Sequence, residues 1–174
     1  MKQIRHPRHQ QGASLLEAIA YLGIAAIVIL GAVSLLTGAF SSAQSNQASE
    51  EVTAIRTAVR KLYMGQGYGT APLNGTLRTA RAFPGTLTVT DIGVATNVWG
   101  GNVVVTGTTG TFTIAYPGLP QDVCLATLVA ASGWQSIASP GTASITTFPV
   151  TPAAAATACS VTAATGNTLT FTSN

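Results

Sequence analysis

The sequence predicts an α+β protein in which a long N-terminal helix, apolar and then amphipathic, packs on a C-terminal antiparallel sheet. Three observations lead to this prediction. Residues 18–40 are an uncharged apolar run, residues 52–62 repeat apolar side chains at helical spacing, and residues 65–174 are rich in Gly, Thr, Ala and Pro with short β-prone segments. The 174 residues are enough for one domain with a buried core.

Residues 18–40 are long enough to cross a bilayer as a helix. The run AIAYLGIAAIVILGAVSLLTGAF has 23 residues, and the apolar core of a bilayer requires about 20. Basic residues precede it, so the leader is expected in the cytoplasm and the C-terminal part outside. The alternative is a secretory signal peptide cut near Ala43, but its apolar core would span only about 7–15 residues.

The helix is expected to continue to residue 64, because no proline occurs between Ala13 and Met64. Glycines at 65, 67 and 69 and Pro72 then end it. Four apolar residues at spacings of 3, 4 and 3 form the stripe that should contact the sheet: Val52, Ile55, Val59 and Leu62. The first half of this helix is apolar all round, so it requires a membrane or other copies of itself to cover it.

Residues 65–174 are predicted to form the sheet. Five segments are expected as strands: Thr86–Ile92, Asn102–Thr106, Thr111–Tyr116, Ser144–Phe148 and Thr168–Thr172. The segments Gly100–Gly101 and Gly107–Gly110 are suited to turns between them. Residues 119–132, LPQDVCLATLVAAS, are expected as a short helix, and the Ala153–Ala156 run as a surface segment.

Cys124 and Cys159 are the only cysteines. If the C-terminal part is exported, they are expected to form a disulfide that closes the region 124–159. Such a closure contributes roughly 3–4 kcal/mol to stability. Two unpaired buried thiols are the alternative, whereas two cysteines without a histidine do not make a metal site.

Charge and histidine placement exclude several classes of protein. Charged residues make up 7% of the chain, against roughly 25% in typical soluble domains. Lys2, Arg5 and Arg8 supply the whole formal charge of +3, so the body is neutral and no nucleic-acid partner is expected. Both histidines, His6 and His9, also lie in this leader. We therefore expect a protein that is not an enzyme and has no catalytic residue, cofactor or metal site.

The junction QQGASLLEAIAYLGIAAIVIL joins a basic leader, ending in Gly12, to Ala13, Glu17 and the apolar run. Ser14 and Glu17 by themselves fit a helix capping box. The whole combination resembles the class III signal of type IV prepilins. The resemblance implies that a prepilin peptidase cuts between Gly12 and Ala13, and that Glu17 guides assembly by pairing with the new Ala13 amine of a neighbouring subunit. The rival account is that Glu17 only caps its own helix.

Two further segments resemble the type IVb branch of this family. KLYMGQGYGTAP, at residues 61–72, is similar to its YxGxG…P stretch, and GLPQDVCLATLV, at residues 118–129, to the segment around the first cysteine of its disulfide region. The chain most resembles the thin-pilus major pilins of conjugative plasmids, strongly over residues 12–70. Two departures are Gln11, where many prepilins have lysine, and Ala13, where Met, Leu or Phe is common. The second leaves N-methylation of Ala13 open.

The resemblance implies a pilin αβ-roll and a structural role, as the major pilin of a type IVb pilus for adhesion, cell aggregation or conjugative mating-pair stabilisation. Residues 1–12 would be the removed leader, 13–64 the helix with its membrane and filament-core part at 18–40, and 65–174 the head. Expected partners are copies of itself, membrane lipid, the prepilin peptidase, the inner-membrane assembly machinery, and an unspecified receptor or recipient cell. The head would lie in the periplasm of a Gram-negative bacterium before the subunit joins an extracellular filament.

A filament of this kind replaces lipid contacts with contacts between apolar helices. The side chains expected in its core are Leu15, Leu16, Ile19, Leu22, Ile24, Ile27, Ile29, Leu30, Val33 and Leu35. Three glycines weaken the same helix by roughly 1 kcal/mol each: Gly23, Gly31 and Gly38. They would allow either local melting in the filament or close approach of neighbouring helices.

Two alternatives share parts of this pattern. A minor pilin or a type II secretion pseudopilin would have the same architecture. Pseudopilins usually carry a C-terminal calcium site, but the last 50 residues contain no Asp or Glu. A membrane-anchored ligand-binding or enzymatic domain would require a constellation of polar residues that the sequence does not show.

Overall fold

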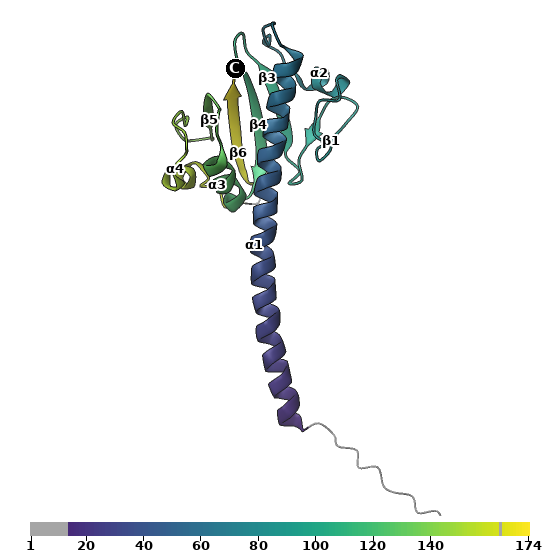
Figure 1. Ribbon diagram of the computed structural model, residues 1–174, viewed down its shortest axis with the longest axis vertical. Helices are drawn as coiled ribbons and strands as arrows, with labels where there is room; N and C mark the ends of the chain where they lie inside the picture. Colours follow the sequence, from purple (N-terminus) through teal and green to yellow (C-terminus); the bar gives the residue numbers. More distant parts are fainter. Residues whose placement is uncertain (1–13, 164) are drawn as a thin grey trace, which may run out of the picture. The chain divides into compact units, whose positions relative to one another are not determined.

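The computed structural model describes residues 14–163 and 165–174. They belong to two units that divide between Phe40 and Ser41, and each is described by itself. Helix α1 runs from Leu15 to Leu62 (Figure 1). Its residues 15–40 are called the apolar segment below, and its residues 41–62 the head segment. A turn follows the helix and leads to Gly65, which has a φ of +78°.

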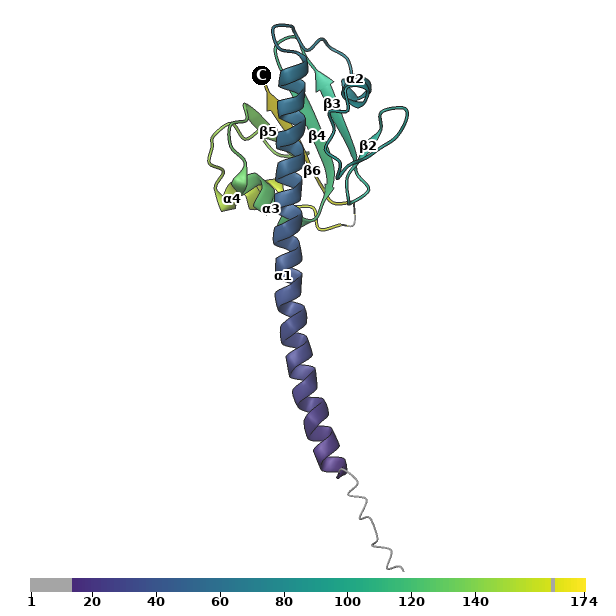
Figure 2. The same ribbon diagram turned by 45° about the vertical axis from the view of Figure 1, so that its right-hand side comes forward.

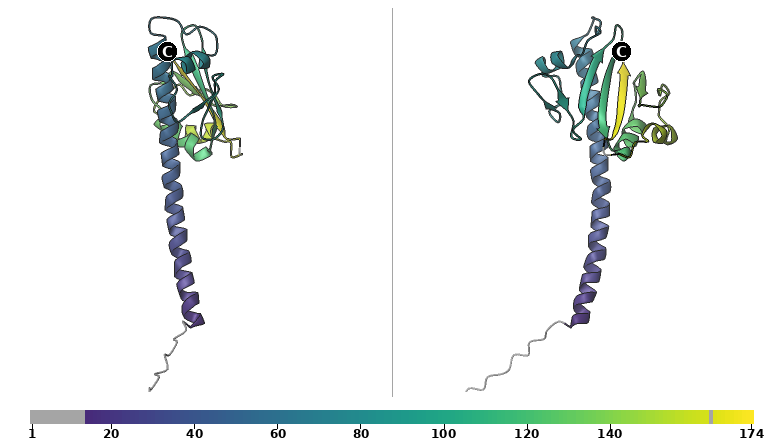
Figure 3. Two further views of the ribbon diagram at one scale, coloured as in Figure 1. Left: turned by 90° about the vertical axis from the view of Figure 1, so that its right-hand side faces the viewer. Right: turned by 180° about the vertical axis from the view of Figure 1, so that it is seen from behind.

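The head, residues 41–174, contains a six-stranded antiparallel sheet with the strand order β1-β2-β3-β4-β6-β5. The strands are β1 (Thr88–Val89), β2 (Ala95–Thr96), β3 (Asn102–Gly107), β4 (Phe112–Leu119), β5 (Ser136–Ala138) and β6 (Asn167–Ser173). The last strand of the chain, β6, therefore lies between β4 and β5, as Figure 3 shows from behind. The predicted α+β fold with an antiparallel sheet is confirmed.

The sheet packs on the head segment of α1 because burial alternates along its central strands. Every second side chain is buried along β6, and along β4 as far as Tyr116, where the register shifts; the inward ones include Phe112, Ile114 and Phe171. They share one apolar core with four residues of the helix, each no more than 2% exposed: Ala48, Val52, Ile55 and Val59. The predicted stripe is thus correct except at its end. Leu62 is 40% exposed, because α1 ends there and the chain turns away.

Two of the predicted strands are wrong in extent or place. Only Thr88–Val89 of the segment 86–92 is a strand, because a turn that ends at Gly93, with a φ of +84°, follows at once. The segment 144–148 forms no strand, and its Ile145 makes a single bridge to Ile137. The edge strand is β5 instead, because its three residues pair directly with β6. The other three predicted strands correspond to β3, β4 and β6.

Three short helices complete the head: α2 (Asn74–Thr79), α3 (Gln121–Ala130) and α4 (Pro152–Ala158). Helix α3 is the one predicted over residues 119–132. The Ala153–Ala156 run lies in α4. Ala153, Ala154 and Ala156 are exposed, as expected of a surface segment, whereas Ala155 is buried. The Thr151 hydroxyl accepts a hydrogen bond from the Ala154 N–H and caps this helix.

Helix α2 is held in place by one side chain that the sequence patterns do not single out. The Asn74 amide donates to the carbonyls of Gly93 and Val103, and its oxygen accepts from the Val105 N–H at 2.7 Å. These bonds join α2 to β3 and to the turn after β1, at the β1 edge of the sheet (Figure 2). The chain from α2 to β2 is therefore a defined part of the head.

Candidate functional site

The apolar segment of α1 exposes its large side chains along its whole length. Its most apolar window has a mean hydropathy of 2.5, and none of that window is buried. The predicted core residues from Leu15 to Leu35 are between 54% and 81% exposed. Twenty-six residues of α-helix span about 39 Å, which is enough to cross a bilayer by length and composition. An apolar surface of this size requires either lipid or protein to cover it.

The first turn of α1 contains half of a capping box. The Ser14 hydroxyl accepts a hydrogen bond from the Glu17 N–H at 3.2 Å. The Glu17 carboxylate does not complete the box, because its Oε1 accepts a hydrogen bond from the Tyr21 hydroxyl at 3.2 Å. Within residues 14–163 and 165–174, no hydrogen bond joins the Ser14 N–H to Glu17. The Glu17 carboxylate therefore makes no capping hydrogen bond to the described backbone of its own helix.

The remaining predicted residues of this site are placed as follows. Gly12 and Ala13 lie outside the described residues, so the cleavage site stays a prediction. Gly23, Gly31 and Gly38 lie inside the continuous helix, and a β-carbon added at any of them would meet no atom within 4 Å. Their predicted role in melting or close packing also stays a prediction.

A buried carboxylate joins the head segment of α1 to the sheet. Glu51 is 2% exposed. Its Oε2 accepts a hydrogen bond of 2.6 Å from the Tyr116 hydroxyl on β4, and its Oε1 accepts one of 2.9 Å from the Gln47 amide. Burying a carboxylate is costly unless donors satisfy it. Both bonds satisfy Glu51, and the one from Tyr116 joins the helix to the sheet, whereas Gln47 lies on α1 itself. No local pattern in the sequence indicates this pair, because Tyr116 lies 65 residues away from Glu51.

Burial, the hydrogen bond to Glu51 and the charge of that carboxylate raise the pKa of Tyr116 above its ordinary value of 10.0. When pH rises past about 10, the unfolded chain loses the phenolic proton while the folded head retains it. The folded state then binds more protons than the unfolded state. This tyrosine therefore makes the head less stable as pH increases above about 10.

Tyr116→Phe should destabilise the head by about 1–3 kcal/mol at neutral pH, because it keeps the ring but removes a donor to a buried carboxylate. The part of the alkaline stability loss that comes from Tyr116 should disappear as well. Urea unfolding at neutral pH and above pH 10 measures both effects. Tyr63→Phe is the matched control, since no hydrogen bond from its hydroxyl is found among the described residues. Equal stability of the two variants would contradict this role for the Tyr116 hydroxyl.

A second set of contacts joins α1 to the end of β6 and to the loop after α3. Arg56 lies over the ring of Trp134, 4.7 Å from its centre, and donates to the Ser173 hydroxyl and the Gly133 carbonyl. Burial and the nearby charge of Arg60 lower the pKa of Arg56 below its ordinary value. The contacts join α1, the end of β6 and the loop after α3.

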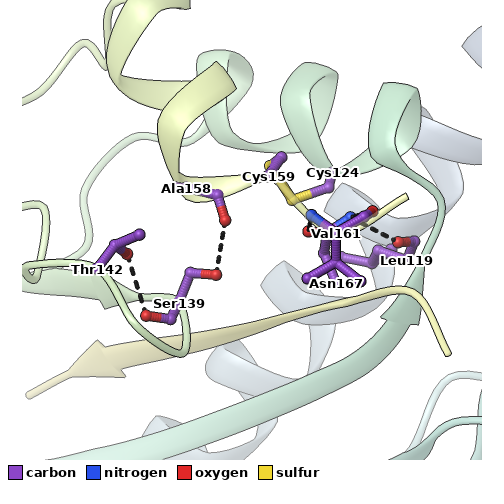
Figure 4. Close-up of a disulfide and its surroundings, with 8 residues drawn as sticks. All are labelled: Leu119, Cys124, Ser139, Thr142, Ala158, Cys159, Val161 and Asn167. Atoms are coloured by element: carbon purple, nitrogen blue, oxygen red, sulfur yellow. Dashed lines mark hydrogen bonds between the residues drawn. A yellow bond between two sulfur atoms is a disulfide. The ribbon is translucent and has the colours of Figure 1, made fainter. Parts of the chain in front are cut away.

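The two cysteines form a disulfide, as predicted, and it joins α3 to the end of α4 (Figure 4). Beside it, the Ser139 hydroxyl donates to the Ala158 carbonyl at 2.7 Å. Asn167, the first residue of β6, donates to the carbonyls of Leu119 and Val161. The disulfide thus closes the region between β4 and β6, which is also held by the pairing of β5 with β6 and by buried side chains of α3 and α4. Within the part of the chain that the structure describes, no three His, Cys, Asp or Glu side chains could together hold a metal ion.

The chain thus has an exposed apolar helical segment followed by a head with a disulfide-closed region. Known proteins with the same features are similar to it. A family model described as "PilS N terminal" matches residues 42–174. The crystal structure of a type IV b pilin from Salmonella typhi is similar to the chain, with a TM-score of 0.59 and 26% identity over 72% of this chain and 97% of that one. No curated protein sequence matches. Because the family model covers well over half of the chain, the protein belongs to the PilS family and is a type IV pilin-like protein.

Proposed function

We propose that this chain is the major structural subunit of a type IVb pilus. It would be made as a membrane-inserted prepilin, cut after Gly12, and polymerised through α1 into an extracellular filament. One observation supports this most directly. The apolar segment of α1 exposes every large side chain that it carries, and a bundle of such helices would remove those side chains from water or lipid together.

The proposal gives each part of the molecule a physical role. Lipid covers the apolar segment before assembly, and neighbouring copies of the same segment cover it afterwards. Glu17 is the one acidic residue of that segment, so a subunit at the wrong height would leave a carboxylate unpaired among apolar helices. The Ala13 amine created by cleavage would supply the opposite charge. The head would then form the outer surface, which contacts other cells.

Imaging of cells with and without the gene tests the proposal. Filaments should be present only when the gene is present, and this chain should be the most abundant protein in sheared, purified filaments. A liquid-mating assay on the same strains would measure the proposed role in mating-pair stabilisation, beside assays of aggregation and adhesion. Filaments that persist without the gene, or that contain only traces of this chain, would contradict the major-subunit proposal and favour a minor pilin.

Gly12→Val should leave the full-length protein in the membrane and abolish filaments. A peptidase that cuts at the membrane face must accept the residue before the cut in an extended form, and a branched side chain at that position would block it. Intact-mass measurement and immunoblotting of membranes measure the result for the variant. Purified filaments of the parent should contain a 162-residue chain that starts at Ala13, which is the 174-residue chain without residues 1–12. Assembled filaments that retain Met1–Gly12 would contradict cleavage. Gln11→Ala, one residue earlier, is the matched control and should be processed.

A further inference from the structure

Most charged side chains of residues 65–174 lie around one pocket of the head. Residues 65–174 contain only four charged side chains, and three of these four, Arg78, Arg81 and Asp91, line one pocket of about 620 Å³. Small-molecule sites usually have volumes of about 300–1,000 Å³. Its lining residues belong to the end of α2, to β1 and to the segments beside them. Figure 1 labels α2 and β1 at this edge of the sheet.

One cation and the anion of this pocket already pair with each other. Arg78 Nη2 donates to Asp91 Oδ1 at 2.7 Å. The Asp91 side chain is fully exposed, and this bond uses only one of its two oxygens. Asp91 Oδ2 is therefore free to accept a hydrogen bond from a ligand hydroxyl.

Arg81 has an unusual backbone for an arginine. Among the described residues it is the one non-glycine residue with a positive φ, at 52°. It lies directly after the C-cap Ala80 of α2, where the left-handed conformation normally favours glycine. The turn itself is closed by backbone bonds, Arg81 N–H to the Arg78 carbonyl and Ala82 N–H to the Leu77 carbonyl. The fold therefore does not require an arginine side chain at this position.

The guanidinium of Arg81 also makes no hydrogen bond or ion pair with any residue in the described parts of the chain. Arg81 therefore has a strained backbone and lines a pocket with a guanidinium that no described residue pairs with. Strain of this kind is found most often at functional sites. Apolar side chains complete the lining, among them the half-buried ring of Phe83 and the buried Leu87.

We propose that this pocket binds an acidic sugar through its carboxylate. The planar guanidinium of Arg81 matches a carboxylate with two parallel hydrogen bonds. Asp91 Oδ2 would accept from a hydroxyl of the same sugar, and Phe83 would contact the C–H face of its ring. Asp91 disfavours a doubly charged phosphate more than a singly charged carboxylate. Because Asp91 is already paired with Arg78, its carboxylate attracts an ammonium group only weakly.

The inference does not depend on the assembly of the chain into a filament, since all of these residues lie in one head. The test therefore uses the full chain, purified in a detergent without a sugar headgroup. Saturation-transfer NMR detects bound ligand, and titration gives the dissociation constant. Glucuronate should bind at least about tenfold more tightly than glucose, which has a hydroxymethyl group in place of the carboxylate. It should also bind more tightly than inorganic phosphate, whose affinity is measured by its displacement of bound glucuronate because phosphate has no C–H signal. Equal binding of glucose, tighter binding of phosphate, or no binding of glucuronate would overturn the proposal.

Arg81→Gly separates binding from folding. Glycine accepts the positive φ without strain, so the melting temperature should stay the same or rise. Glucuronate binding should nevertheless weaken at least about tenfold. Arg60→Ala removes an exposed arginine of α1 outside this pocket and should leave binding unchanged. Unchanged binding by Arg81→Gly, or an equal loss in Arg60→Ala, would overturn the assignment of the carboxylate to Arg81.

Discussion

Replacing Glu17 with glutamine should abolish most filament formation while the protein is still made, inserted and at least partly cleaved. A carboxylate among apolar helices costs several kcal/mol unless a positive charge compensates it. In the proposed filament that charge is the Ala13 amine of a neighbour, so the pair would form only when the subunits are in register. Glutamine removes the attraction but keeps the size and the hydrogen-bonding capacity of the side chain. Filament yield after shearing, compared with processed subunit in membranes, measures the effect.

The first turn of α1 supplies a matched control for this experiment. The Ser14 hydroxyl accepts from the Glu17 N–H, whereas the Glu17 carboxylate accepts from Tyr21. Ser14→Ala therefore removes the cap, at a cost of about 1 kcal/mol, and leaves the charge of Glu17 in place. We expect Ser14→Ala to assemble and Glu17→Gln to fail. A normal pilus yield from Glu17→Gln, or an equal failure of both variants, would remove the charge of Glu17 from the assembly mechanism.

The second large effect is expected from loss of the disulfide. Cys124→Ser should destabilise the head by about 3–4 kcal/mol, because the bond closes a loop across a sequence separation of 35. That is a large fraction of the stability of an ordinary domain. Subunit abundance should fall more than membrane insertion, because insertion depends on the apolar segment. Urea unfolding of purified protein measures the stability, and fractionation followed by immunoblotting measures abundance and insertion.

The serine variants also test whether the bond alone accounts for the loss. Cys124→Ser, Cys159→Ser and the double variant all remove the same bond, so their losses should be similar rather than additive. Free thiols found by alkylation of the native parent protein would contradict the disulfide. Losses that add in the double variant would show that the cysteines act through separate packing instead.

Elements with a strong local pattern were predictable from the sequence. The uncharged run before Ser49 and the stripe at Val52, Ile55 and Val59 identify α1 without reference to the rest of the chain. The strands β3, β4 and β6 alternate buried and half-buried or exposed side chains, so their period of two is visible in the sequence. The predicted disulfide needed only the cysteine count and the direction of export.

Elements that depend on distant partners were not predictable. Segment 144–148 has the β-branched composition of a strand, but β6 pairs with Ser136–Ala138 instead, and composition does not determine which segment takes an edge position. Helix α4 has no apolar stripe, although Thr151 followed by Pro152 is a helix-start signal that could have identified it.

The polar residues inside the head show the same limit. Glu51 lies beside Val52 on the buried face of α1, and an isolated acid on a helix is usually exposed. Only its bond to Tyr116, far along the chain, explains its burial. Asn97 and Asn167 each hold separate segments through three hydrogen bonds of their amides. The structure contains the apolar helix predicted for the candidate site. Cleavage after Gly12 and the pairing of Glu17 stay predictions.

The position of β6 determines when the sheet of the head can be completed during biosynthesis. Its residues, Asn167–Ser173, are synthesised after those of β1 to β5, yet they fill the place between β4 and β5. Until they arrive, Phe112 and Ile114 lack the neighbouring strand and β5 has no strand to pair with. A nascent chain that lacks this strand therefore cannot yet complete the sheet of its head. A premature stop codon just before Asn167 would leave α1 intact and its head without a central strand.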